Sequence, residues 1–377
     1  MICLSANRSS LIKENHKKRN DREDHDSLAD TLKRRILARA DKYFPEENIN
    51  NCIVSCVPHN FHSQNIIFLF EVLINHSIKK GIIAKVTLPE VTKTGGLVEY
   101  ETIKALFIDS EMAKNYFSVP RPLDFFHDIN AMLTEKVDGM SLSHLLKKEN
   151  SLFASAQTLN YLNSLMKACG KCLKIYHGLN PTEIKNPLPE NPFYKLFEKI
   201  ELSYEYLAKR EMIQEKTKEM LIKYIDKAKD RISRHTFKLV KYHGDPCVGN
   251  FIVNGQEITI LDFNFATKDI IHSDISTYLM SLDILNPYPK NFFFNFLNMR
   301  LFKESFLEGY FTSLSEITAL DWFLIYICKI RQTLVHFNDR YDQYTDFNLM
   351  KKSQFYIYKL IYNKRLQRDM KQLSLHL

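Results

Sequence analysis

The sequence predicts an α+β fold of two lobes: a small antiparallel β N-lobe with one helix, followed by a larger, mostly helical C-lobe. Short apolar runs with the periodicity of strands dominate the first third of the chain. From Ser141 onward the apolar residues recur with the helical period of 3.6. The length of 377 residues also exceeds that of one ordinary domain, which favours two lobes.

The composition of the first segment separates it from the rest of the N-lobe. Residues 1–27 are rich in Asn, Lys, Arg, Asp and Ser, which predicts a disordered polar tail. A first helix is expected over residues 28–43, and Pro45 ends it. We therefore expect a tail over residues 1–27, an N-terminal lobe over 28–136 and a C-terminal lobe over 137–377.

The remaining elements of the N-lobe follow from short apolar runs separated by turn residues. Strands are expected over residues 51–57, 66–74 and 81–88, and a helix is expected over residues 97–107. A further pair of strands flanks Pro120-Arg121-Pro122 and ends at residues 131–137. A hinge between the lobes is expected near residues 134–139, because Asp138-Gly139 forms a turn there.

The C-lobe shows long amphipathic patterns interrupted by one hairpin. Helices are expected over residues 141–148, 154–178, 193–209, 211–235, 274–285, 291–311, 315–337 and 349–371. The interruption consists of two apolar runs, Phe251–Val253 and Glu257–Leu261, joined at Asn254-Gly255. Asn-Gly between two such runs is a strong signal for a β-hairpin.

The charge and the cysteines limit the class of protein. A net charge of +8 is compatible with binding to a nucleotide, an acidic membrane surface or a nucleic acid. No short module interleaves Arg with aromatics, so we expect no nucleic-acid partner. No apolar run approaches the roughly 20 residues of a membrane span. Seven cysteines without a signal peptide favour a reducing, cytoplasmic location. Cys169 and Cys172 have redox spacing but fall within a helical pattern, which favours packing in the core.

The segment before the hairpin carries the chemistry. It reads His243-Gly244-Asp245-Pro246-Cys247-Val248-Gly249-Asn250, and Asp262 follows the second strand of the hairpin. The turn returns the chain, so Asn250 and Asp262 are expected at the same end of two paired strands. Phosphoryl transfer requires a carboxylate that receives a hydroxyl proton and oxygen ligands for Mg²⁺. The alternative is that these residues are turns and caps brought together by coincidence.

These residues, with Asp262-Phe263-Asn264-Phe265-Ala266, resemble the aminoglycoside phosphotransferase and choline kinase family, which is related to the protein kinases. The resemblance covers about residues 45–340, and further similar segments are 133–139, Gly170–His177, His272–Ile275 and Phe306–Tyr310. It implies a bilobal protein-kinase-like fold. It also implies an enzyme that uses ATP and Mg²⁺ to phosphorylate a hydroxyl group.

The resemblance also implies roles for single residues of the C-lobe. Asp245 corresponds to the catalytic aspartate, which orients the hydroxyl and takes its proton late. Asn250 and Asp262 correspond to the metal ligands. His243 and Asp274 correspond to residues that support the catalytic loop.

In the N-lobe the resemblance points to nucleotide binding. Lys85 is similar to the strand lysine that contacts the α- and β-phosphates, although a lysine in a strand can also be an edge charge that faces solvent. Its acidic partner is expected to be Glu99, with Glu101 as the alternative. Glu135, in the hinge strand, is included in the nucleotide site.

The expected phosphate loop departs from the family pattern. Ser63 and Asn65 fit the Ser/Asn positions of the loop over residues 58–65, but this loop contains no glycine. Close approach of a backbone to a phosphate is harder without glycine, which puts nucleotide affinity and choice in question.

Two segments bear on the acceptor. Acidic and aromatic residues interleave in an expected loop over residues 339–347, where Asp342, Tyr344 and Asp346 are candidates to hold a cationic amine. The alternative is a solvated polar connection. The last helix, over residues 349–371, carries many Lys and Arg residues together with aromatics. This pattern is typical either of a helix that rests on an anionic membrane surface or of a surface helix whose aromatics pack on the lobe.

The sequence therefore predicts a small-molecule phosphotransferase whose acceptor is a hydroxyl of a sugar, an amino alcohol or a glycoside. One alternative is a weakly active or inactive kinase-like module that binds nucleotide. Another is a kinase of a membrane-linked or cell-envelope sugar. A protein kinase is disfavoured, because Gly244 stands where a His-Arg-Asp loop has Arg and Asn264 stands where an Asp-Phe-Gly motif has Gly.

Overall fold

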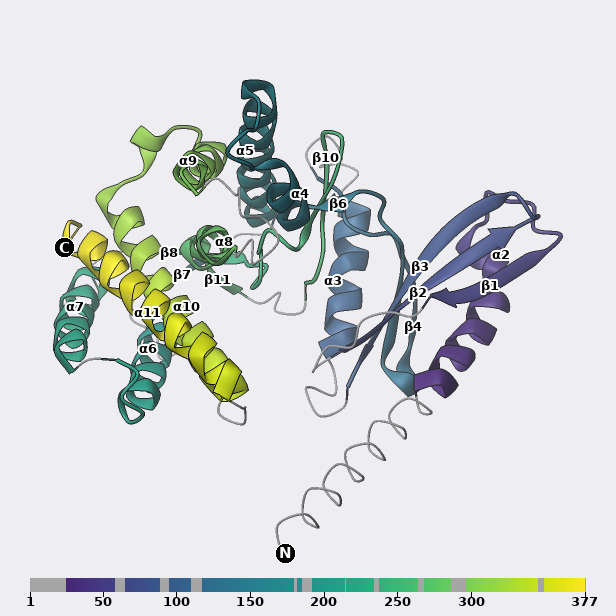
Figure 1. Ribbon diagram of the computed structural model, residues 1–377. Coiled ribbons are helices and arrows are strands. Elements are labelled where there is room, and N and C mark those ends of the chain that lie inside the picture. Colours follow the sequence, from purple (N-terminus) through teal and green to yellow (C-terminus); the bar gives the residue numbers. More distant parts are fainter. Residues whose placement is uncertain are drawn as a thin grey trace, which may run out of the picture. The chain divides into compact units, whose positions relative to one another are not determined.

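The chain divides into two compact units (Figure 1). The first comprises Met1–Asp109 and Val119–Asp138, and the second comprises Ser110–Ser118 and Gly139–Leu377. The structure is a computed structural model that describes residues 25–57, 65–88, 95–109, 117–179, 182–184, 192–213, 215–233, 237–263, 268–285, 296–344 and 349–376. The loop over residues 58–64, with Ser63, lies outside the described residues.

An antiparallel sheet of five strands forms the N-terminal unit, in the order β1-β2-β3-β5-β4. Its strands are β1 (Cys52–Val57), β2 (Asn65–Ile74), β3 (Ile78–Thr87), β4 (Pro122–Phe126) and β5 (Ala131–Glu135). Helix α3 (Gly95–Asp109) connects β3 to β4 and packs against β3, β4 and β5 (Figure 1). The strands predicted over residues 51–57, 66–74, 81–88 and 131–137 and the helix predicted over 97–107 are confirmed, whereas β4 begins at Pro122 rather than after it.

The two faces of this sheet have different partners. Alternate side chains of β2 and β3, among them Phe68 and Ala84, form one buried cluster with Leu32 and Ile36 of a helix over residues 25–37. Because neighbouring side chains of a strand point to opposite faces, Lys85 lies on the other face, where α3 packs. A short helix α2 (Ala40–Tyr43) follows. The expected helix over 28–43 thus divides in two, and residues 25–27, assigned to the tail, are helical.

Eight α-helices are described in the C-terminal unit. They are α4 (Leu142–Glu149), α5 (Ala156–Gly178), α6 (Pro192–Ala208), α7 (Glu215–Ser233), α8 (Ile271–Ile284), α9 (Asn298–Phe311), α10 (Ala319–Tyr344) and α11 (Leu349–Ser374). Helices α4 and α5 begin at serines, Ser141 and Ser155, whose hydroxyls accept backbone amides of the first turn. The prediction of a loop over 339–347 was wrong for residues 339–344, because α10 continues through Tyr344.

Two small antiparallel sheets support the loop that precedes the hairpin. One has the order β10-β9-β6 and contains the hairpin strands β9 (Phe251–Asn254) and β10 (Glu257–Ile260), with β6 (Met140–Ser141). The other has the order β11-β8-β7 and consists of β7 (Thr182–Ile184), β8 (Phe237–Lys241) and β11 (Lys268–Ile270). The hairpin was predicted, whereas β6, β7, β8 and β11 were not, because such short strands depend on distant partners.

Close contact between α5 and α9 explains why glycine stands at positions 170 and 309, in the segments Gly170–His177 and Phe306–Tyr310. A Cβ atom on Gly170 would lie 2.1 Å from the carbonyl oxygen of Phe306, and one on Gly309 would lie 2.0 Å from that of Lys167. The backbones therefore touch, and only glycine fits at both positions. Cys169 and Cys172 of the same helix are buried thiols, and burial raises the pKa of Cys172 to about 12. Their predicted packing in the core is confirmed.

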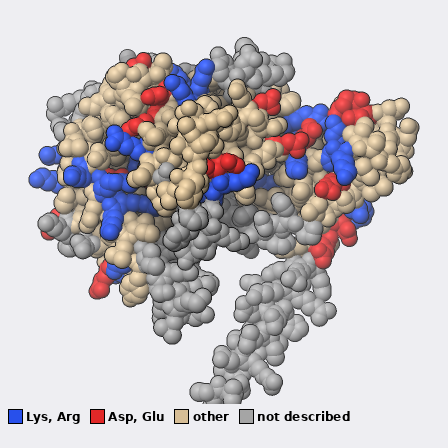
Figure 2. Space-filling model, turned by 45° about the horizontal axis from the view of Figure 1, so that its top comes forward, with Lys and Arg blue, Asp and Glu red and all other residues tan. Residues whose placement is uncertain are grey.

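The surface of the C-terminal unit is rich in positive charge. Figure 2 shows Lys and Arg side chains gathered on one part of this unit, at the left of the view. Helix α11 packs on α10 along the buried residues Tyr362, Leu366 and Met370. None of the described helices combines the length and the apolar character that crossing a bilayer requires.

Candidate active site

The carboxylate of Asp274 holds the segment that follows β8. Asp274 lies in the first turn of α8 and is fully buried. Its Oδ2 accepts the backbone amide of His243 at 2.6 Å, and its Oδ1 accepts that of Gly244 at 2.9 Å. Oδ2 also accepts His177 Nε2 at 2.9 Å. Asp274 therefore fixes the path of the backbone immediately before Asp245.

The imidazole of His243 links this loop to the hairpin. Its Nε2 donates to the carbonyl oxygen of Leu261 at 2.9 Å, and its Nδ1 lies 3.3 Å from the backbone nitrogen of Asp245, which donates to it. These contacts describe a neutral imidazole, and burial lowers the pKa of His243 accordingly. The ring of Phe263 lies 4.7 Å from that of His243. His243 thus bridges Asp245 and the end of β10.

Asp245 and Asn250 lie against each other in this loop. The Nδ2 of Asn250 donates to the backbone oxygen of Asp245 at 2.8 Å and to its Oδ2 at 3.3 Å. The backbone of Cys247 closes a tight turn by donating to the Asp245 oxygen at 2.8 Å. Because the amide nitrogen faces Asp245, the Oδ1 of Asn250 is the atom that can ligate a cation.

The hairpin brings Asp262 beside Asn250, as the Asn-Gly turn predicts. Strand β10 pairs with β9 up to Ile260 and Phe251, and the amide of Leu261 then donates to the Asn250 oxygen at 2.9 Å. Asp262 follows with a φ of +66°, a left-handed conformation that Asp tolerates better than most residues. The carboxylate of Asp262 and the amide of Asn250 are oxygen ligands of the kind that Mg²⁺ takes.

Burial and like charge perturb Asp245. Its pKa is raised above the ordinary value, first because the carboxylate is buried and then because Asp262 is negatively charged. Burial and the nearby Asp245 also raise the pKa of the Cys247 thiol to about 12. This thiol is therefore no nucleophile at neutral pH. The loop concentrates negative charge, which a bound cation would relieve.

In the N-terminal unit Lys85 and Glu99 form a buried ion pair. The Nζ of Lys85, on β3, lies 2.9 Å from Glu99 Oε2 on α3. Only 9% of Lys85 and 1% of Glu99 are exposed. The alternative of a solvent-facing edge charge is wrong, because β3 is the central strand. Glu101, the alternative partner, is exposed.

The other residues assigned to nucleotide binding lie at the ends of strands. Asn65 begins β2, and its buried Oδ1 has no hydrogen-bond partner in the described part of the chain. Glu135 ends β5, where its Oε2 lies 3.0 Å from Nε of Arg121. Ser63 lies outside the described residues. The roles of Asn65 and Glu135 toward a nucleotide stay predictions.

The residues suggested for the acceptor are only partly described. Asp342 and Tyr344 belong to the last turns of α10, and their side chains lie outside the description, as does the whole of Asp346. Their acceptor role stays a prediction.

Two residues near the site had no assigned role in the sequence. His177 is the last residue of the family-like segment Gly170–His177. Its Nδ1 lies 2.7 Å from the hydroxyl of Tyr310, the last residue of the family-like segment Phe306–Tyr310. His336 of α10 lies close enough to lower the pKa of Asp245. The spacing of the motifs could have indicated His177 and Tyr310, but no pattern in the sequence indicated His336.

Known proteins resemble this chain in sequence and in fold. The model of the phosphotransferase enzyme family matches residues 108–312, which is more than half of the chain. A comparison with the curated proteins finds none that matches it.

Among solved structures, a choline/ethanolamine kinase family protein from Mesorhizobium loti superposes with a TM-score of 0.53 at 15% identity, over 90% of this chain and 96% of its own. Plasmodium vivax ethanolamine kinase has a TM-score of 0.51 at 14% identity, over 86% of this chain and 83% of its own. Choline kinase from Cryptosporidium parvum also has a TM-score of 0.51, at 15% identity, over 90% and 94%. This chain therefore belongs to the phosphotransferase enzyme family and is an enzyme with a protein-kinase-like fold.

Proposed function

We propose that this protein transfers the γ-phosphate of ATP to a hydroxyl of a small molecule, namely a sugar, an amino alcohol or a glycoside, in a reaction that requires Mg²⁺. The observation that carries the proposal is the arrangement of Asp245, Asn250 and Asp262 around one turn and one hairpin. The fold supports a small acceptor, because the structures similar to it include choline and ethanolamine kinases.

Asp245 acts on the acceptor. Its carboxylate would orient the hydroxyl and receive the proton as the bond between the acceptor oxygen and the γ-phosphorus forms. The bond between that phosphorus and the β–γ bridging oxygen breaks, and ADP leaves with its electron pair. The amide of Asn250, 3.3 Å from Asp245 Oδ2, would fix the direction in which this carboxylate points.

Asn250 and Asp262 would hold Mg²⁺ through Oδ1 and the carboxylate. One amide and one carboxylate suit this ion, which keeps water and phosphate oxygens among its ligands. When bound, Mg²⁺ supplies positive charge that neutralises the phosphates. It would also offset the repulsion between Asp245 and Asp262 that raises the pKa of Asp245.

Lys85 would bind the α- and β-phosphates, and Glu99 would hold its ammonium group in place. The ion pair of 2.9 Å is buried, so Lys85 has little freedom to adopt other rotamers. The buried Oδ1 of Asn65 stands at the end of the expected phosphate loop and would orient that loop. We place the reaction in a reducing cytoplasm, since the described cysteines are free thiols.

The test is ATP consumption by the purified protein with MgCl₂ and pooled sugars, amino alcohols and aminoglycosides. We expect turnover that depends on an acceptor and on Mg²⁺. Asp245→Asn should remove turnover while calorimetry still detects binding of a non-hydrolysable ATP analogue, and Asp128→Asn, on an exposed 3-10 turn, should change neither. Nucleotide binding without turnover in any pool would instead identify an inactive kinase-like module.

A further inference from the structure

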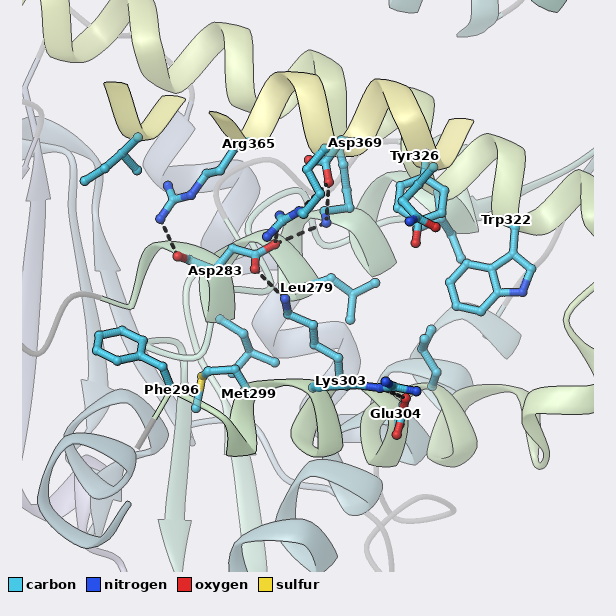
Figure 3. A pocket seen from close by; sticks show the side chains of 18 residues that line it. Leu279, Asp283, Phe296, Met299, Lys303, Glu304, Trp322, Tyr326, Arg365 and Asp369 are labelled. Carbon is cyan, nitrogen blue, oxygen red and sulfur yellow. Dashed lines mark hydrogen bonds and ion pairs between the residues drawn. The ribbon is translucent and has the colours of Figure 1, made fainter. Parts of the chain in front are cut away.

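A cavity of about 920 Å³ opens between α8, α9, α10 and α11 of the C-terminal unit (Figure 3). It is separate from the loop that contains Asp245. Helix α8 carries Asp274, which holds that loop, in its first turn and Asp283, which lines the cavity, near its end. Nine residues separate them, which corresponds to about 13 Å along the helix.

The centre of the cavity wall is a buried network of charges. Asp283 lies 3.1 Å from Lys329 Nζ, 3.0 Å from Arg368 Nη2 and in contact with Lys303. Asp369 lies 3.2 Å from Lys329 and 3.3 Å from Arg368. Burial alone would raise the pKa of Asp283, but Lys329, Lys303 and Arg368 hold it well below its ordinary value. Asp283 is therefore ionised, and both carboxylates are already paired.

Positive charge is in excess among the side chains that line the cavity in the described part of the chain. Five are basic and three are acidic: Arg300, Lys303, Lys329, Arg365 and Arg368 against Asp283, Glu304 and Asp369. Burial lowers the pKa of both Lys303 and Arg365; Asp283 opposes this effect, and neighbouring cations add to it. The charged forms of these groups are thus less favourable here than in water, and an anion would relieve them.

Arg365 is the cation without a carboxylate of its own. Its guanidinium donates to the backbone oxygen of Asp283, and no ion pair joins it to an acidic side chain within the described ranges. Figure 3 shows Arg365 directed at the Asp283 end of the cavity. A largely buried cation of this kind indicates a place for an anionic ligand.

Apart from Gln372, the rest of the lining is apolar and aromatic. Leu279, Leu307 and Ile325 are buried or nearly so, and Trp322 stacks on Tyr326 with 5.9 Å between the ring centroids. Phe296 also lines the cavity although 63% of it is exposed. The volume lies within the range of about 300–1,000 Å³ of small-molecule sites, which combine apolar walls with a few polar groups.

We propose that this cavity is a second ligand site, which takes a small organic anion whose phosphate or carboxylate group pairs with Arg365 and whose apolar body packs against Trp322 and Leu279. Guanidinium is suited to such anions because its fork donates two parallel hydrogen bonds. The site is independent of the proposed phosphotransfer, since none of its residues belongs to the catalytic loop or the hairpin.

Trp322 allows a direct test, because it is the single tryptophan of the chain. The probes are octyl phosphate and octanoate below their micelle concentrations, with 1-octanol and octylammonium as uncharged and cationic controls. We expect saturable changes of tryptophan fluorescence with both anions, and apparent affinities at least tenfold weaker for the controls. Equal responses to all four probes, or no saturable response to either anion, would overturn the proposal.

Two variants distinguish ligand binding from a loss of folding. Arg365→Gln removes the charge, and Ile361→Glu supplies a carboxylate four residues before Arg365 on the same helix, an arrangement that stabilises helices. We expect at least a tenfold rise in the apparent Kd for octyl phosphate in both. Arg34→Gln, an exposed guanidinium in the N-terminal unit, is the matched control and should not change it. A folded Ile361→Glu protein that binds octyl phosphate like the wild type would contradict the proposal.

Discussion

Asp274 accepts the backbone amide of His243 at 2.6 Å, so a side chain in the first turn of α8 fixes the backbone on which Asp245 stands. The same carboxylate accepts Gly244 and His177. Three donors on two other segments thus converge on one buried carboxyl group. This convergence holds the backbone of the loop from outside the loop itself.

The first prediction concerns Asp274→Asn. The new amide nitrogen cannot accept a hydrogen bond, so one of the three donors remains unpaired in a fully buried place. We expect a loss of about 3 kcal/mol in the free energy of unfolding and about a 100-fold fall in turnover, because the loop is displaced. Urea unfolding and the ATP assay measure the two effects. Asp128→Asn, on the surface, should leave turnover unchanged and lower stability only slightly, and an Asp274→Asn protein of wild-type stability would contradict the anchoring role.

The second prediction concerns the stability of Asp245→Asn as a function of pH. The pKa of Asp245 is raised in the folded state, so the native protein holds its proton more tightly than the unfolded chain does. Ionised Asp245 therefore costs stability above its folded pKa, and this cost is absent below the ordinary pKa of about 3.9. We expect the variant to melt above the wild type at pH 7, by about 2–4 °C for each kcal/mol of relief.

The advantage of Asp245→Asn should disappear as the pH falls toward 4, which melting curves at a series of pH values can follow. Asp128→Asn is the matched control with the opposite sign. Hydrogen bonding to Arg35 lowers the pKa of Asp128. Removing this carboxylate should therefore lower the stability slightly at pH 7 and have no effect in acid. An Asp245→Asn protein less stable than the wild type at neutral pH would show that the carboxylate stabilises the fold.

The third prediction concerns the pair of Lys85 and Glu99. Lys85→Met or Glu99→Gln alone leaves one buried charge without its partner, which costs about 3–5 kcal/mol. The double variant removes both charges, so its loss of stability should be smaller than the sum of the two single losses. Urea unfolding of the four proteins gives the coupling. Strictly additive losses would mean that the 2.9 Å contact contributes nothing. Lys85→Met should also raise the KM for ATP, whatever the outcome for stability.

The fourth prediction concerns the contact of α5 with α9. An alanine at Gly170 or Gly309 would place a methyl group about 2 Å from a carbonyl oxygen of the other helix, so the helices must separate. We expect each substitution to cost about 1–3 kcal/mol or more. Gly178→Ala is the control, because its Cβ meets nothing within 4 Å. It should be neutral or stabilise the helix by up to about 1 kcal/mol. Equal effects of the three substitutions on thermal unfolding would contradict the close approach.

Much of the fold could be predicted because its signals are local. The alternation in β2 and β3 fixes a sheet with two different faces, and it requires only neighbouring residues. The Asn254-Gly255 turn fixes which residues of β9 and β10 are opposite each other, and so places Asp262 beside Asn250. Helical periodicity likewise predicted the long helices α5 and α6 to within two residues of their ends, whereas α10 extends seven residues beyond its predicted end.

The short strands and the C-terminal end of α10 could not be predicted, for different reasons. The segment Phe237–Lys241 carries no pattern long enough to indicate a strand. It becomes strand β8 because it pairs with β7 and β11, which lie far from it in the chain. Residues 339–344 are polar and interleaved like a loop, yet they continue α10, because a helix already formed extends at little cost.

The sequence by itself determined the fold class, the hairpin and the identity of the charged residues in the loop from His243 to Asn250, because each depends on periodicity or on a turn of a few residues. Only the tertiary structure decided how the environment of Asp245 in this loop differs from that of Asp274 in α8. Asp274 is fully buried and backbone amides converge on it, whereas Asp245 is partly buried, lies beside a second carboxylate and has a raised pKa. The physical reason is that burial and neighbouring charge come from segments distant in the chain, and these set the chemistry of a carboxylate.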